Sequence, residues 1–184
     1  MEISKAERLQ LLMMCDIYRT LEIDNSFDPD VIEEAITSGN FWAIEWEYQS
    51  LDAEPVSQDT VRFVSNVLDM FTGLKATYDM LEQEDKDALA RDIPHFSVDS
   101  SLTFEGFDGN NEPTHLGVTH MFNKMGRFTT TPNLTANSHM PVVGLYSRML
   151  DVYTPLRGNF THHNGIGFEN LKAVLLERTH PSNR

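Results

Sequence analysis

The stretch SQDTVRFVSNVLDMFTGLKATYDML, residues 57–81, decides the fold class. Apolar side chains recur in it every three or four residues for about six helical turns, which is typical of one long helix with one buried face. These side chains are Val61, Val64, Val67, Leu68, Phe71, Leu74, Tyr78 and Leu81. Ser57, which follows Pro55, is a favoured N-cap residue. A helix with such a face needs other helices to cover it.

Two shorter helices are predicted upstream. Ser4 and Glu7 have the spacing of a capping box, in which a serine caps the helix and a glutamate three residues later caps the serine. The helix that they open extends to about residue 21. Asp28-Pro29 combines a capping aspartate with a proline in the first turn, and Gly39 supplies the left-handed stop of this second helix.

Residues 41–51 predict a third helix that is rich in aromatic side chains. Phe41, Trp42, Trp46 and Tyr48 occur within it. A helical stripe of this kind usually packs into a core, so we expect these rings to be buried, with a subunit interface as the second interpretation.

Downstream of residue 81, the acidic residues 82–87 either extend the long helix or open a short new one to Arg91. A boundary between the acidic part and the histidine-rich part is predicted near residues 92–100. Further helices are predicted at 112–124, 140–153 and 168–177. Residues 126–139 are small and polar, and loops of this length often have a function. Residues 102–111 are rich in turn formers and allow at most a short hairpin.

We therefore predict an all-α (mainly α) fold of about 6–8 helices. A chain of this length favours a single compact domain over residues 1–184, with an acidic helical layer at about 1–92 and a histidine-rich part at about 100–178. No alternation of strands and helices indicates a doubly wound sheet.

The charge is uneven along the chain. The 184 residues carry a net charge of −14; residues 1–112 have 25 acids and 7 bases, whereas residues 113–184 have 3 acids and 7 bases. Such an acidic surface repels phosphate backbones and anionic lipids, which disfavours nucleic acid and membrane partners. The single cysteine, Cys15, excludes a disulfide framework, and no stretch is long and apolar enough for a transmembrane helix. We expect a cytoplasmic protein.

The histidines do not have the spacing of a metal site. His115 and His120 are five positions apart, not the four that point two imidazoles at one ion from a helix, and His162 and His163 are adjacent. No phosphate-binding or nucleophile motif is present. We therefore expect no metal, no cofactor and no catalytic residues. An alternative hypothesis is a hydrolase or a nuclease-like toxin that uses His115, His120 or His139 with Asp108.

One group of charged residues differs from the solvated acids elsewhere. Asp108 and Glu112 lie in a turn rich in glycine and asparagine, and Arg127 occurs in the same region. A carboxylate held by an arginine is commonly a structural tie, and the functional alternative is the floor of a polar pocket.

Several pieces of the chain occur in an order that resembles a known family. They are Thr103-Phe-Glu-Gly106-Phe107-Asp108, Leu116-Gly117, Phe122, Gly126-Arg127-Phe128 and Tyr146-x-Arg148-Met149-Leu150-x-Val152, with looser matches at Ala6-Glu-Arg8-Leu9 and Val67-Leu68-Asp69-Met70. Together they resemble the YfbU family of bacterial and archaeal proteins over about residues 4–155. The last thirty residues match poorly.

The resemblance implies a helical cytoplasmic domain and brings no reaction with it. It also implies a stress-related role, and relatives fused to a helix-turn-helix segment suggest ligand sensing. Arg148 lies among the matched pieces, on a helix whose neighbours are apolar. We expect it to form a ligand-binding polar cluster with Asp108, Glu112 and Arg127, under the 126–139 loop.

These observations favour a non-enzymatic regulatory, ligand-binding or protein-interaction domain. We expect a homo-oligomer joined through apolar helix faces, with a small molecule or another protein as a further partner. An enzyme should bring its titratable groups into one cleft, whereas a binding module should have an apolar pocket with few polar groups.

Overall fold

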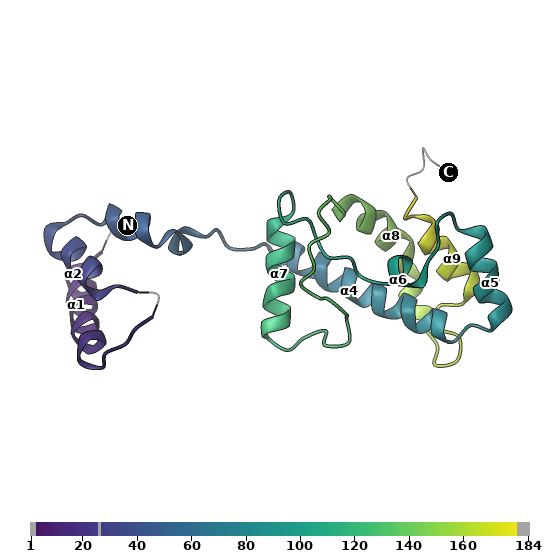
Figure 1. Ribbon diagram of the computed structural model, residues 1–184, viewed down its shortest axis with the longest axis horizontal. Coiled ribbons are helices and arrows are strands. Elements are labelled where there is room, and N and C mark those ends of the chain that lie inside the picture. The colour runs from purple at the N-terminus through teal and green to yellow at the C-terminus, as the bar shows by residue number, and fades with distance from the viewer. Residues whose placement is uncertain (1–2, 26, 180–184) are drawn as a thin grey trace. The chain divides into compact units, whose positions relative to one another are not determined.

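The computed structural model describes residues 3–25 and 27–179, and its described part forms nine α-helices (Figure 1). The helices are α1 (Lys5–Thr20), α2 (Pro29–Ser38), α3 (Trp42–Glu47), α4 (Gln58–Asp79), α5 (Gln83–Asp92), α6 (Val98–Ser101), α7 (Pro113–Lys124), α8 (Val143–Leu156) and α9 (Phe168–Leu176). The described residues also form two 3₁₀ turns, η1 (Gln49–Asp52) and η2 (Arg157–Asn159). The predicted mainly helical fold is confirmed.

The chain divides into two compact units. The N-terminal unit is Met1–Pro55 and the C-terminal unit is Val56–Arg184. The predicted boundary at residues 92–100, between the acidic part and the histidine-rich part, lies inside the C-terminal unit. The single domain over the whole chain stays a prediction.

The first two helices begin and end as the sequence predicts. The Ser4 hydroxyl accepts a hydrogen bond from the Glu7 N–H at 3.3 Å, and the Glu7 carboxylate accepts one from the Ser4 N–H at 2.8 Å. Asp28 caps α2 through the N–H of Asp30 at 2.9 Å, and Gly39 ends α2 with φ of 77°. Local hydrogen bonds and the backbone preference of glycine therefore account for these ends.

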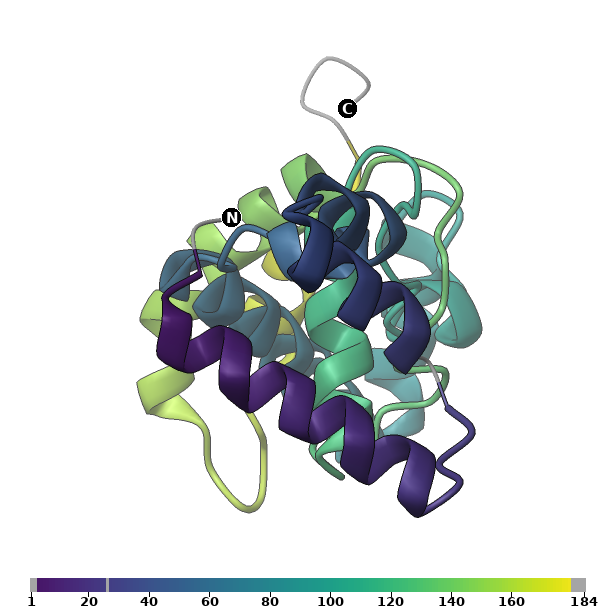
Figure 2. The same ribbon diagram turned by 90° about the vertical axis from the view of Figure 1, so that its left-hand side faces the viewer.

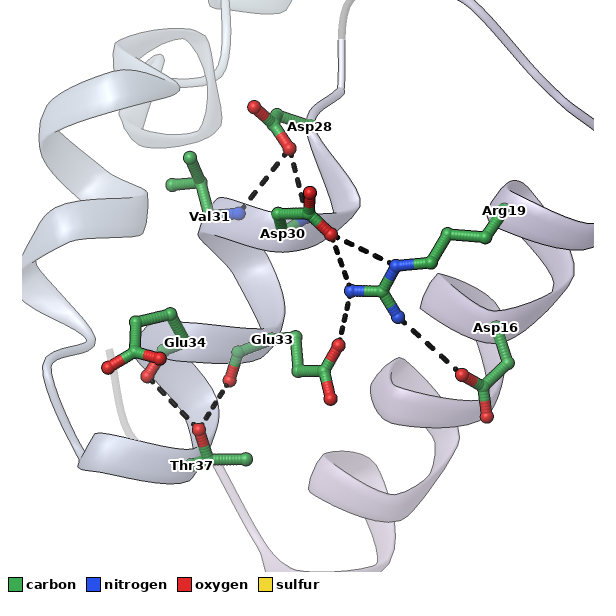
Figure 3. Close-up of polar contacts among 8 residues, drawn as sticks. All are labelled: Asp16, Arg19, Asp28, Asp30, Val31, Glu33, Glu34 and Thr37. Atoms are coloured by element: carbon green, nitrogen blue, oxygen red, sulfur yellow. Dashed lines mark hydrogen bonds and ion pairs between the residues drawn. The ribbon is translucent and has the colours of Figure 1, made fainter.

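Helices α1 and α2 pack against each other and are joined by a charged cluster around Arg19 (Figure 3). The guanidinium donates two hydrogen bonds to one oxygen of Asp30, at 3.0 and 2.7 Å, and another to Glu33. Asp16, one turn back on α1, lies 3.5 Å away. The hydrogen bonds to Asp30 and Glu33 raise the pKa of Arg19 further above its ordinary value. The cluster links the C-terminal end of α1 to the first half of α2, beside the apolar contacts between the two helices.

The expectation that the aromatic stripe is buried is wrong for its two tryptophans. Trp42 is 62% exposed and Trp46 is 74% exposed, and their rings contact each other edge to face. Ile44 is the residue of α3 that enters the small core, where it packs with Ala35 and Ile36. Helix α3 is only six residues long, so it can bury only one side.

Helix α4 is the centre of the C-terminal unit. Its buried side chains extend from Val64 to Thr77, and α7, α8 and α9 all contact it (Figure 1). The interior that they enclose is rich in aromatic rings: Phe71, Phe104 and Tyr146 lie within 6.0 Å of one another, centroid to centroid.

Thr77 of α4 holds the segment that precedes α9 through a hydrogen bond to Ile166. Its fully buried hydroxyl donates to the Gly73 carbonyl at 2.8 Å and accepts a hydrogen bond from the Ile166 N–H at 3.2 Å. The segment then continues into α9, whose Leu171, Val174 and Leu175 are buried in the same core. Residues 166–175, in which the sequence pattern showed no resemblance to the family, are therefore part of the folded interior.

The remaining differences from prediction are local. Helix α8 begins at Val143 and includes Pro155, and the four-residue helix α6 lies where no pattern was visible. Residues 102–111 contribute an isolated bridge between Phe107 and Asn137. Residues 126–139 form no regular helix or strand, as predicted.

Candidate functional site

Glu112 is the buried centre of the predicted polar region. The residue is 8% exposed, and its carboxylate accepts three backbone hydrogen bonds. Oε1 accepts from the N–H groups of Val142 and Val143, at 2.8 and 2.7 Å, and Oε2 accepts from the Asp108 N–H at 3.1 Å. Glu112 therefore caps the start of α8 from another part of the chain, where free N–H groups favour a negative charge.

Asp108 organises the turn that precedes α7. Its side chain is 1% exposed. One oxygen accepts a hydrogen bond from the Asn110 N–H at 3.0 Å, and the other accepts one from the Asn111 amide. The Asn111 bond, followed by the Asn110 N–H, lowers the pKa of Asp108 below its ordinary value, with a smaller contribution from the charge of His139. The carboxylate is engaged within its own turn.

The two arginines of the predicted cluster lie elsewhere. Arg127 is exposed, and Arg148 donates through Nη1 to the Gly144 carbonyl one turn back on α8, at 3.0 Å. Between residues that the structure describes, no ion pair joins either arginine to Asp108 or Glu112. Backbone N–H groups take the place of the expected arginine partner. A ligand-binding role for these four residues stays a prediction.

A cavity of about 370 Å³ lies beneath the 126–139 loop. Thr130, Thr131 and Pro132 form its loop side, and α4 contributes Lys75 and Asp79. Lys75 and Asp79 form an ion pair at 2.6 Å. None of Asp108, Glu112, Arg127 and Arg148 lines this cavity.

The three histidines of the alternative hypothesis have different surroundings. His115 is half-buried, with Phe63 at 5.6 Å and Phe107 at 5.3 Å between ring centroids. His120 is exposed on α7, and His139 is exposed in the loop with φ of 55°. In the described ranges, no three or more histidine, cysteine, aspartate or glutamate residues are grouped as metal ligands would be.

Burial of His115 predicts a loss of stability in acid. Desolvation lowers its pKa from 6.5, partly opposed by the charge of Glu112. Below pH 6.5 the unfolded chain therefore binds a proton that the folded chain resists, and stability falls with pH until the folded-state pKa is passed. His115→Gln should remove this part of the pH dependence, measured by urea unfolding on both sides of pH 6.5. His120→Gln is the control and should retain it.

The N-terminal unit contains a strongly apolar cavity. It has a volume of about 290 Å³. The described residues that line it are all aliphatic, aromatic or sulfur-containing: Ile3, Leu11, Met14, Cys15, Tyr18, Phe27, Pro29, Ile32, Ile44, Tyr48 and Leu51. Among the described residues, its polar side-chain groups are two tyrosine hydroxyls and one thiol.

The polar groups of this cavity are tied to its rim or buried in its wall. The Tyr48 hydroxyl accepts a hydrogen bond from the Asp28 N–H at 2.8 Å, and the Tyr18 hydroxyl accepts one from the Asn25 amide at 3.4 Å. Cys15 is 4% exposed, and burial raises the pKa of its thiol. Met14, Phe27 and Leu51 are partly exposed and form the mouth.

Comparison with protein families identifies the chain. A family model described as YfbU domain matches residues 1–174. The chain belongs to the YfbU family. The match includes both units of this YfbU protein and extends through most of α9, beyond the region in which the sequence resemblance was visible. No curated protein matches the chain.

The cavity is the feature that sequence reasoning missed. A signal was available, because α1 has apolar residues on two sides: Leu11, Leu12 and Cys15 on one, and Leu9, Met13 and Ile17 on another. Only one of these sides can face α2.

In the described part of the chain, no helix is both long enough and apolar enough to cross a membrane.

Proposed function

We propose that this YfbU protein is a non-enzymatic regulatory domain that binds a small apolar molecule in the cavity of its N-terminal unit. The observation that supports this is the uniformly apolar lining of the cavity. Ligand sites are concave and mostly apolar with few polar groups, and this volume lies near the lower end of their range. An apolar cavity of this kind holds water poorly, because water needs polar partners.

The net charge of the N-terminal unit limits which ligands can enter its cavity. Residues 1–55 contain 13 acids and 3 bases, a net charge of −10. A field of this sign repels anions from the mouth, so we propose a neutral or cationic ligand with an apolar body. A homo-oligomer and a stress-related role are parts of the same proposal.

Cys15 provides the test, because it is the only cysteine of the chain and lines the cavity. The probe is N-phenyl naphthylamine, which is neutral and fluoresces in apolar surroundings. At a concentration about ten times its Kd, the probe should slow alkylation of Cys15 by N-ethylmaleimide about tenfold. Without the probe, the alkylation rate should rise at a higher pH than that of a free cysteine, because burial raises the pKa of the thiol.

Two matched substitutions of isoleucine locate the probe. Ile32→Phe adds a ring to the cavity wall and should weaken probe binding about tenfold. Ile23→Phe makes the same change at an exposed position of the same unit outside the cavity and should leave binding unchanged. Equal affinities in the two variants, or a probe that does not protect Cys15, would refute the proposal.

A second candidate function is supported by the acids themselves. Residues 21–55 contain ten acids and no lysine or arginine. Such a surface suits a basic protein partner, and its attraction is screened at high salt. Capture of the partner should then weaken steeply as the salt concentration rises.

A further inference from the structure

Helix α1 has a second apolar face that the N-terminal unit leaves uncovered. Leu9 is 60% exposed, Met13 57%, Ile17 44% and Leu21 64%. The other side of the helix packs against α2 and lines the cavity with Leu11 and Cys15. A helix that is apolar on two sides is normally buried on both. We call Leu9, Met13, Ile17 and Leu21 the α1 ridge. Figure 2 shows helix α1, in purple, along its length.

The N-terminal unit exposes more apolar side chains than its size explains. Of the 16 large apolar side chains that are exposed among the described residues, ten belong to residues 3–55. Monomeric proteins rarely leave a contiguous apolar patch uncovered, and such patches mark interaction sites.

We propose that the α1 ridge is a dimer interface at which it packs against the same ridge of a second copy of this chain. The spacing of the ridge favours a like partner. Residues four positions apart form a ridge that slants across a helix surface, and two such ridges interdigitate when their helices cross at about 50°. An isologous contact of this kind closes on itself, because the same surface serves both subunits.

Charge is the second argument for a like partner. The three bases of residues 3–55, Lys5, Arg8 and Arg19, all lie on α1. With Glu7 and Asp16, they give this helix a net charge of +1 within a unit of −10. Within this acidic unit, two copies repel each other least where α1 meets α1.

The charges beside the ridge also complement each other under a two-fold axis. Lys5 and Asp16 are about three helical turns apart, so they lie on one flank of the ridge. An axis midway between them passes between Leu9 and Met13 and places Lys5 opposite Asp16 of the second copy, twice in each dimer. Asp16 is 80% exposed, and its pairing with Arg19 at 3.5 Å leaves it accessible.

This proposal deepens the homo-oligomer part of the proposed function and is independent of the cavity. Light scattering after gel filtration should give twice the chain mass of 21.0 kDa at micromolar concentrations. Leu9→Glu should weaken the dimer about a hundredfold, because two glutamates enter one apolar contact. Met121→Glu is the control: Met121 is 54% exposed on α7 of the C-terminal unit, and the dimer should persist.

A charge exchange distinguishes a second copy from any other occupant. Lys5→Glu and Asp16→Lys should each weaken the dimer about tenfold, since each places like charges together at two sites. The double variant Lys5→Glu/Asp16→Lys should restore the affinity to within about threefold.

Three results would overturn the interface. They are a monomeric protein at micromolar concentrations, a double variant as weak as the single ones, and a Leu9→Glu variant with unchanged mass. If Leu9→Glu lowers stability with unchanged mass, the chain itself covers the ridge. Protection of Cys15 by the probe is a separate measurement that tests only the cavity. The cavity proposal and the interface proposal can therefore be refuted independently.

Discussion

Glu112→Ala should lower the free energy of unfolding of the C-terminal unit by about 4 kcal/mol. The carboxylate holds the N–H groups of Val142, Val143 and Asp108, and its removal leaves these donors without their acceptor. A buried donor without a partner costs about 1–3 kcal/mol. Urea unfolding measures the loss, and we expect the melting temperature to fall by roughly 10 °C.

Glu112→Gln is the matched control for this prediction. The amide oxygen can still accept the hydrogen bonds of Val142 and Val143, whereas its NH₂ group cannot accept the bond from the Asp108 N–H. The loss should be about half that of the alanine variant. If alanine costs less than about 1 kcal/mol, Glu112 is not the structural tie described above.

Gly106→Ala should be the second severe substitution, with a loss of about 3–5 kcal/mol. Gly106 has φ of +94°, a conformation that side-chain-bearing residues rarely adopt. An added Cβ would also lie 1.9 Å from the Ala136 carbonyl oxygen, so the backbone of the 126–139 loop must move. A shift of the Gly106 backbone would also break the hydrogen bond that the buried Tyr146 hydroxyl donates to the Gly106 carbonyl, at 3.2 Å.

Gly144→Ala tests the same chemical change where the structure tolerates it. Gly144 is inside α8, and an added Cβ there meets nothing within 4 Å. Alanine is the better helix former, so this variant should be more stable by about 0.5–1 kcal/mol. A destabilised Gly144→Ala together with a neutral Gly106→Ala would contradict the described backbone.

Much of the fold could be predicted from local signals. The capping box at Ser4 and Glu7, the Asp28-Pro29 start of α2 and the stop at Gly39 all use hydrogen bonds or backbone preferences within a few residues. The long α4 follows from periodicity, because most of its buried side chains are apolar ones of residues 57–81; the polar Thr77 is an exception. These features depend little on the rest of the chain.

The features that matter most for function depend on distant contacts. The sequence placed Glu112 in a polar cluster, but nothing local shows that it reaches Val142 and Val143, thirty residues away. Trp42 and Trp46 are exposed because α3 buries only Ile44 in the small core. The cavity arises where α1, α2 and α3 fail to fill the space between them, and periodicity carries no information on such gaps.

The methyl resonance of Met14 tests the central claim most directly, because Met14 lies at the mouth of the apolar cavity. Methyl NMR of methionine-labelled protein, with Met14→Leu for assignment, would follow the titration with N-phenyl naphthylamine. Ring currents from the bound probe should shift the Met14 signal, while the fully buried Met70 and Met149 of the C-terminal unit stay unchanged. A Met14 signal that does not move at saturating probe would contradict the proposal that the N-terminal unit of this YfbU protein is a binding module for apolar molecules.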